Sequence, residues 1–312
     1  MKPPQRLAVN YYPMYLFQLF LIRCLATPFA FLPMRWSQGL GAYLGLLLIK
    51  YNKKRQHIAL TNFRACFPNE TMEQHQERLK QTAMEAGKWL MESPYVWFRH
   101  PDYLARKVKA RNPEVLEAAY AKGRGVVLVI PHHGNWEMMN FYVPQRYPTG
   151  AMYRPIKSPV FEKIIFDGRS RVGTDLFTAD SSGVRKALKA LKKNKVVVVL
   201  SDHLPSENAG VHAPFFGHPA LTGKLTHNLV KYNQSEVVIA TAIRLPKGEG
   251  FDLHFAPIEG VNTNDSVAAA TALNKAIEKS ILLAPAQYQW VYRRFAKPPI
   301  GVADMYMSDQ NT

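Results

Sequence analysis

Apolar residues recur along the chain with two different periods. Short continuous apolar runs are typical of strands buried on both faces, and they predict strands at residues 125–130, 150–153, 195–200, 237–243 and 251–256. Segments with helical spacing lie before and between them, at about 52–68, 71–95, 113–122, 137–144, 158–170, 181–194, 222–233 and 264–282. This alternation predicts an α/β fold, with a central, mostly parallel or mixed sheet flanked by helices.

The N-terminal segment is apolar and aromatic. Residues 7–22 carry no charge, and the apolar pattern resumes after Arg23. No run reaches the roughly 18 uncharged residues of an unambiguous spanning helix. We predict a membrane-anchoring helix within about residues 11–33, so that the chain divides into an N-terminal anchor, 1–34, and an α/β domain, 35–312. The alternative is that these residues form core helices of a soluble protein.

The chain is strongly basic, with a formal net charge of +17 over 312 residues. Such a balance indicates nucleic acid, an anionic membrane or an anionic substrate as a partner. The aromatic N-terminus favours the membrane, and no nucleic-acid binding is predicted. Lys50 and the basic residues 53–55 favour a body on the cytoplasmic side. Cys24 and Cys66 have no metal-type spacing, so neither a zinc site nor a disulfide framework is predicted.

The sequence PHHGNWE, residues 131–137, stands where a predicted strand ends and a helix begins. In α/β proteins, ligands and catalytic groups gather at such strand ends. Four residues separate His132 from Glu137, so the carboxylate could hold one imidazole nitrogen while the other acts as a general base. The alternatives are a metal site formed by His132, His133 and Glu137, and a histidine that only caps a helix.

Blocks of this sequence resemble, in the same order, those of the late (secondary) acyltransferases of lipid A biosynthesis. These lauroyl and myristoyl acyltransferases belong to the glycerolipid and lysophospholipid acyltransferase superfamily. The block around the histidines is GRGVVLVIPHHGNWE, with an H-x4-E pattern. The other blocks are RQHIALTNFRACFP (55–68), YRP (153–155), GRSR (168–171), LSDH (200–203), APFFGHPALTG (213–223) and QYQWVYRRFAKPP (287–299). Together they cover almost the whole chain from about residue 10.

The resemblance implies a glycerolipid acyltransferase-like fold and a specific reaction. A fatty acyl chain would pass from acyl carrier protein to a hydroxyl of a Kdo-bearing lipid A precursor, at the cytoplasmic face of the bacterial inner membrane, in lipopolysaccharide or lipooligosaccharide biosynthesis. His132 and Glu137 would be the catalytic pair, and acyl carrier protein would be the co-substrate, with no cofactor and no metal. The residue after the catalytic histidine is commonly apolar in the family, whereas here it is His133.

Other residues of these blocks are candidate substrate ligands. They are Arg154, Arg169, Arg171, Asp202, Phe215 and Phe216. The arginines can hold phosphate through two-point contacts, and Arg169 matches an arginine of the family, but a solvated basic helix face is the alternative. Asp202 follows a predicted strand and could bond a sugar hydroxyl, orient Arg169 or cap the next turn. The two phenylalanines could line an acyl channel or pack in a core turn.

Two further functions stay open. One is acyl transfer to another glycolipid or to a lysophospholipid. The other is a non-catalytic, membrane-associated role with a degenerate site, against which the intact pair of His132 and Glu137 argues.

Overall fold

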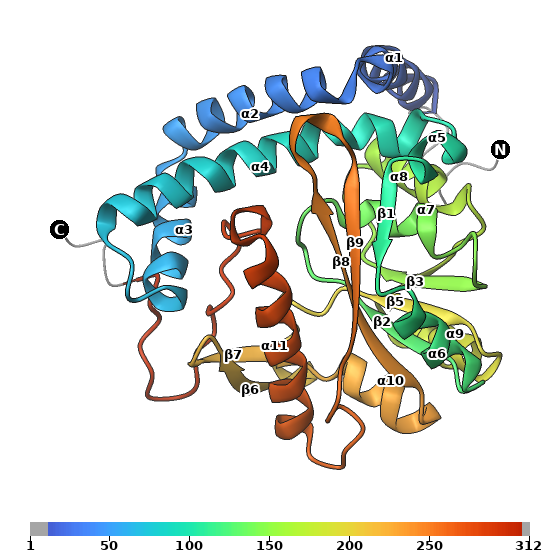
Figure 1. The fold of residues 1–312 in the computed structure, drawn as a ribbon, viewed down its shortest axis with the longest axis vertical. Helices are drawn as coiled ribbons and strands as arrows, with labels where there is room; N and C mark the ends of the chain where they lie inside the picture. Colours follow the sequence, from blue (N-terminus) through green and yellow to red (C-terminus); the bar gives the residue numbers. More distant parts are fainter. Residues whose placement is uncertain (1–11, 308–312) are drawn as a thin grey trace.

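A seven-stranded sheet forms the centre of the structure, a computed structural model that describes residues 12–307 (Figure 1). The strands, in order across the sheet, are β1 (Val108–Arg111), β9 (Phe251–Pro257), β8 (Glu236–Arg244), β2 (Val126–Val129), β5 (Val196–Val199), β3 (Thr149–Tyr153) and β4 (Asp175–Thr178). Neighbouring strands are parallel except for β8 and β9, which are antiparallel. The predicted α/β fold with a mostly parallel sheet is confirmed.

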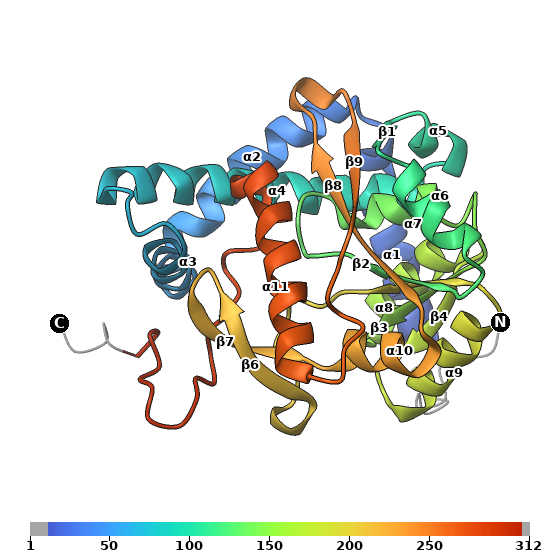
Figure 2. The same ribbon diagram turned by 60° about the horizontal axis from the view of Figure 1, so that its bottom comes forward.

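Helices cover both faces of this sheet (Figures 1 and 2). They are α1 (Tyr12–Phe31), α2 (Met34–Tyr51), α3 (Lys53–Cys66), α4 (Met72–Phe98), α5 (Pro101–Ala105), α6 (Glu114–Ala121), α7 (Met139–Tyr142), α8 (Pro159–Ser170), α9 (Ser181–Lys192), α10 (Leu225–Asn233) and α11 (Ser266–Leu283). Residues of α3, α9, α10 and α11 pack on one face, and residues of α5, α6 and α7 pack on the other. Helix α4 crosses the carboxyl ends of the strands, and α2 lies along it.

The two central strands explain why the apolar runs are continuous. Successive side chains of a strand point to opposite faces. Val127 and Val197 belong to the core on one face, while Leu128 and Val198 belong to the core on the other. Because helices cover both faces, neither face of β2 or β5 is left for polar residues.

The predicted helices and strands are present, with ends that differ by a few residues, but several short elements were not predicted. Strands β1 and β4 are four-residue edge strands with charged or polar positions, so they lack the apolar run. A separate hairpin of β6 (Gly210–Phe215) and β7 (His218–Gly223) was also missed. Each of its strands contains a proline, and its turn places Phe216 and Gly217 at positive φ.

Helix α1 falls within the predicted anchor. Its residues Met14–Phe31 are long and apolar enough to cross a membrane, and only 17% of them are buried, whereas a core helix would be mostly buried. The helix nevertheless touches the body: Tyr15 and Leu19 pack against Val160 and Ile164 of α8. Residues 1–11 of the predicted anchor lie outside the described residues.

Exposed apolar side chains continue from α1 onto α2. Those of α1 are Met14, Leu16, Phe17, Phe20, Leu21, Leu25, Phe29 and Phe31, and those of α2 are Trp36, Leu40, Tyr43, Leu47, Leu48 and Tyr51. The opposite side of α2 lies very close to α4, because Gly41 and Gly45 face Ala83 and Gly87 with no room for a Cβ. The apolar surface therefore extends beyond residue 34, past the predicted end of the anchor.

Candidate active site

The loop after β2 carries both histidines and is fixed through its backbone. Gly134 has a φ of +61°, and a Cβ there would lie 1.8 Å from the carbonyl oxygen of Ala242, so glycine is required. The N–H groups of Gly134 and Asn135 donate to the carbonyls of Gln287 (3.0 Å) and Ala242 (2.9 Å). These bonds hold the loop between the end of β8 and the segment that follows α11.

His132 is held by a carboxylate from the end of the neighbouring strand. Its Nδ1 lies 2.8 Å from Oδ1 of Asp202, and its backbone N–H donates to Oδ2 at 2.8 Å. Asp202 follows β5 and is almost fully buried. Burial alone would raise the pKa of Asp202, but the charge and hydrogen bonds of His132 outweigh it and hold the pKa well below its ordinary value. A buried, ionised carboxylate on Nδ1 leaves Nε2 as the nitrogen that can exchange a proton.

Two more rings fix the plane of the His132 imidazole. His203 stacks on it with ring centroids 3.7 Å apart and planes 3° apart, and Tyr292 stacks on the other side of His203 at 4.0 Å. The Nε2 of His203 lies 2.9 Å from Oε1 of Gln289. Burial lowers the pKa of His203, and the charge of His132 lowers it further. The orientation of His132 is therefore set by packing as well as by Asp202.

Glu137 does not hold His132, contrary to the expected geometry. Its Oε2 accepts from Nε of Arg169 at 3.0 Å, a second Arg169 nitrogen contacts Oε1, and Asn140 donates to Oε2 at 3.2 Å. Among the described residues, His132 pairs with Asp202 and not with Glu137. A short 3-10 helix, Trp136–Met138, turns the buried Glu137 side chain toward α8. Burial would lower the pKa of Arg169, but the Glu137 carboxylate outweighs it and raises the pKa.

His132 and the Glu137–Arg169 pair border a largely apolar cavity of about 440 Å³. His132, Trp136, Glu137 and Arg169 line it together with residues from α4, β3, α8 and the end of β5. Its apolar wall includes Trp89, Leu90, Trp97, Ile130, Met139, Met152, Ile165 and Leu176. A cavity of this size and composition can take an apolar chain and bring it to the imidazole.

His133 faces the other way and is fully buried. Its Nε2 lies 2.8 Å from the carbonyl oxygen of Ala284, and burial lowers its pKa to about 4. His132 and His133 therefore cannot ligate one metal ion together. In residues 12–307 no group of three or more His, Cys, Asp or Glu side chains is placed to hold a metal.

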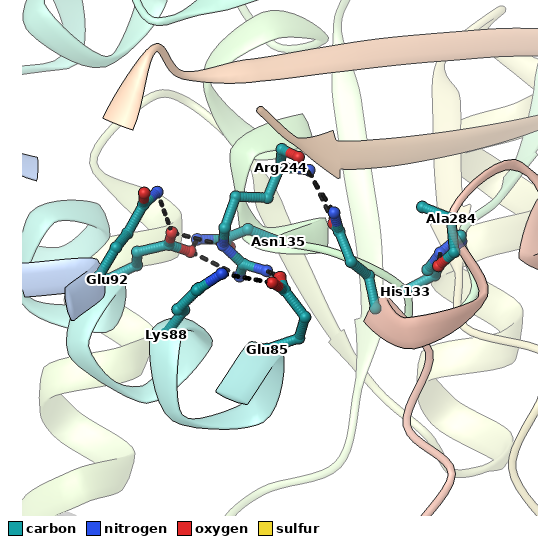
Figure 3. A network of polar contacts seen from close by, with 9 residues as sticks. Glu85, Lys88, Glu92, His133, Asn135, Arg244 and Ala284 are labelled. Atoms are coloured by element: carbon teal, nitrogen blue, oxygen red, sulfur yellow. Dashed lines mark hydrogen bonds and ion pairs between the residues drawn. The ribbon is translucent and has the colours of Figure 1, made fainter. Parts of the chain in front are cut away.

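A buried ion-pair network lies next to this loop (Figure 3). Arg244, at the end of β8, donates to both oxygens of Glu92, at 2.6 and 2.7 Å, and to Glu85 at 2.5 Å. Glu92 also accepts from Asn135 of the histidine loop (2.9 Å) and from Gln38 of α2 (2.8 Å). Burial would lower the pKa of Arg244, but the two carboxylates outweigh it and raise the pKa. The network joins α2, α4, β8 and the loop.

Comparison with known proteins shows the family of this chain. A family model for bacterial lipid A biosynthesis acyltransferases matches residues 4–297. The chain belongs to this family. It is 30% identical to a lipid A biosynthesis lauroyltransferase of Escherichia coli over 269 residues, which are 86% of this chain and 87% of that protein. It is also 30% identical, over 86% of this chain and 87% of the other, to a lipid A biosynthesis palmitoleoyltransferase of the same organism.

A more distant relative is a phosphatidylinositol mannoside acyltransferase of Mycobacterium tuberculosis. It is 27% identical over 216 residues, which are 62% of this chain and 65% of that protein. These relatives are all acyltransferases by name, and His132 and Glu137 lie within the residues that the family model matches.

Of the remaining candidate substrate ligands, one lies at the cavity and three make contacts elsewhere in the fold. Arg154 is exposed at the cavity, beside β3. Arg171 instead donates to the carbonyl of Val96 at 2.6 Å and lies over the ring of Phe141. Phe215 and Phe216 do not line the cavity; both belong to the core around Trp290. This cavity does not support the acyl-channel interpretation, because Phe215 and Phe216 lie at the turn of the β6–β7 hairpin, whereas Gly223 at its other end lines the cavity.

Three residues of the site were not singled out from the sequence of this acyltransferase. His203 and Trp136 contact His132, Tyr292 stacks on His203, and all three lie inside blocks that carried the family resemblance. His203 is adjacent to Asp202, at the end of a predicted strand, which is the signal that could have found it. Tyr292 lies 89 residues from His203 in sequence, so nothing local indicates their contact.

Proposed function

We propose that this protein transfers a fatty acyl chain from the thioester of acyl carrier protein to a hydroxyl of a Kdo-bearing lipid A precursor. The observation that carries the proposal is the His132–Asp202 pair at an apolar cavity, in a chain of the lipid A acyltransferase family. A cytoplasmic site at the bacterial inner membrane fits the exposed apolar surface of α1 and α2 and the basic residues that follow it.

In the proposed step, Nε2 of His132 takes the proton of the acceptor hydroxyl while the hydroxyl oxygen attacks the thioester carbonyl carbon. The tetrahedral intermediate collapses, the carbon–sulfur bond breaks, and the thiolate takes the proton back from the imidazolium. Asp202 keeps the proton of the neutral ring on Nδ1 and stabilises the imidazolium. No covalent acyl-enzyme is needed, since the donor is already an activated thioester.

In this proposal Glu137 contacts Arg169 and not the imidazole of His132. The carboxylate fixes the guanidinium at the cavity wall. From there Arg169 would stabilise either the oxyanion of the intermediate or a phosphate of the acceptor. In this proposal Glu137 is a positioning residue that acts through Arg169, and His132 relies on Asp202.

The decisive experiment uses purified protein in mixed micelles with acyl carrier protein thioester and the Kdo-bearing precursor. We expect one added acyl chain by mass spectrometry, and none when Asp202→Asn/His132→Ala replaces the wild type. Lipid A from cells with and without the protein should differ by the same mass. An unchanged lipid A profile, with acyl transfer to a different lipid in the lysate, would refute the acceptor assignment.

A second acceptor class is supported by one specific finding, the similarity to a phosphatidylinositol mannoside acyltransferase. The cavity walls suit any acyl chain, so the acceptor head group decides between the two. Assaying a mannosylated phosphatidylinositol beside the lipid A precursor separates them directly.

A further inference from the structure

Helix α9 carries a basic face whose side chains form no ion pair with any described residue. The sequence SSGVRKALKALKKNK, residues 181–195, holds six basic residues and no acidic one. Lys195 pairs with Asp175. The other five are exposed, and no described residue forms an ion pair with them: Arg185, Lys186, Lys189, Lys192 and Lys193.

These five side chains share one side of the helix. At about 100° per residue they fall within a sector of about 120°. The opposite side is buried against the sheet through Gly183, Ala187, Ala190 and Leu191. Like charges at i, i+4, such as Arg185 and Lys189, destabilise a helix. A face that costs stability and forms no ion pair within the described residues is suited to an external polyanion.

The helix starts at the cavity. Ala179 lines the cavity, and its N–H donates to the carbonyl of Tyr153 at 2.9 Å, next to Arg154. Asp180 then caps α9 by accepting from the N–H of Gly183. A 12-residue helix is about 18 Å long, so the basic face begins within two turns of the cavity wall.

The position of α9 favours a soluble partner over the bilayer, because α9 lies far from the apolar surface of α1 and α2 (Figure 1). Figure 1 shows α1 and α2 along the upper edge of the molecule and α9 at the lower right, and Figure 2 again separates α2 from α9. If the exposed apolar side chains of α1 and α2 enter the membrane, the basic face of α9 remains in the aqueous phase. A soluble acidic protein can reach it there.

We propose that the basic face of α9, defined by Arg185, Lys186, Lys189, Lys192 and Lys193, is the docking surface for acyl carrier protein. The inference rests on the proposed function, because it names the part of the surface that receives the acidic donor. Docking at α9 would bring the thioester arm to the cavity past Ala179 and Arg154.

The test compares two charge reversals of the same size. Arg185→Glu/Lys189→Glu alters the α9 face. Lys275→Glu/Lys279→Glu is the control, because these exposed residues have the same i, i+4 spacing on α11. For both variants, kcat and KM are measured with acyl carrier protein thioester and with a small acyl-pantetheine thioester. Circular dichroism melting checks the fold.

We expect the α9 variant to raise KM for the protein thioester about tenfold or more, with a weaker dependence on salt. Its kinetics with the small thioester should stay unchanged, and so should both reactions of the α11 variant. An unchanged KM of the α9 variant, or an equal rise in both variants, would overturn the docking surface. So would a loss of binding to anionic vesicles without a change in KM, because the face would then contact the bilayer.

Failure of the proposed function has a different signature. A wild type that neither binds acyl carrier protein nor uses its thioester, yet accepts the small thioester, overturns the donor assignment. A wild type that uses the protein thioester and an α9 variant that matches it overturn only the docking surface.

Discussion

His132 and His133 are adjacent in the chain but belong to two different regions of the molecule. The region around His132 opens to a cavity, and its imidazole keeps one nitrogen free of protein partners among the described residues. The region around His133 is closed, with Arg244, Glu92 and Asn135 bonded to one another nearby. The comparison shows that polar residues of one loop can serve chemistry or structure, depending on which side of the loop they face.

The largest effect should come from His132→Ala. A general base typically contributes about 10²–10⁴-fold to the rate, and we expect kcat to fall by that factor. His133→Gln, the matched control, should keep most of the turnover at neutral pH, because His133 does not reach the cavity. Near wild-type turnover of purified His132→Ala would remove the base assignment.

Arg244→Met should act on stability and not directly on chemistry. Removing one partner of a buried ion pair typically costs about 3–5 kcal/mol, since Glu92 would stay buried without its cation. Denaturant unfolding measures the loss. The double variant Arg244→Met/Glu92→Leu should recover part of it, and if the double variant is less stable than the single one, the pair is not the source of the cost.

His133 should make the fold sensitive to acid. An unfolded histidine takes up a proton below about pH 6.5, whereas burial lowers the pKa of His133 in the native protein to about 4. The unfolded state therefore binds more protons between these values, and stability falls as pH falls through that window, by roughly 3 kcal/mol in total. Unfolding of His133→Gln measured from pH 7 to 4 should lack this component; a parallel pH dependence would contradict it.

Asp202→Asn and Glu137→Gln decide which carboxylate serves His132. Asparagine keeps the shape of Asp202 but cannot hold the same tautomer or stabilise the imidazolium, so we expect kcat to fall about 10²-fold. Because His132 is still present, the limb of the pH–rate profile that belongs to the base should move and not disappear. If only Glu137→Gln altered that limb, the sequence-based pairing of His132 with Glu137 would be right and the Asp202 contact would be structural.

Arg169→Lys should have the smallest effect of this series, and it separates two roles. Lysine keeps the charge but loses the planar two-point contact, which we expect to cost about tenfold. If Arg169 holds an acceptor phosphate, KM for the acceptor rises and discrimination against a dephosphorylated acceptor weakens. If it stabilises the oxyanion, kcat falls and that discrimination stays.

The sequence by itself determined five of the seven strands of the sheet and the loop that carries the candidate site. Continuous valine runs can be satisfied only in strands covered on both faces, and a polar loop with glycine at the end of such a run marks the active edge of the sheet. The family resemblance added the expected reaction and the proposed catalytic histidine. The edge strands β1 and β4 were not predicted, because their short, partly polar sequences carry no continuous apolar run.

Only the tertiary structure decided which groups pair. Spacing in sequence brings Glu137 near His132, but parallel strands place the ends of β2 and β5 side by side, and so Asp202 reaches the imidazole from 70 residues away. Glu137 is turned toward Arg169 by its short helix for the same reason: direction is fixed by packing, not by separation along the chain. Burial also distinguishes the two histidines, because His133 is fully buried whereas His132 lines the cavity. In the sequence they differ only in their distance to Glu137.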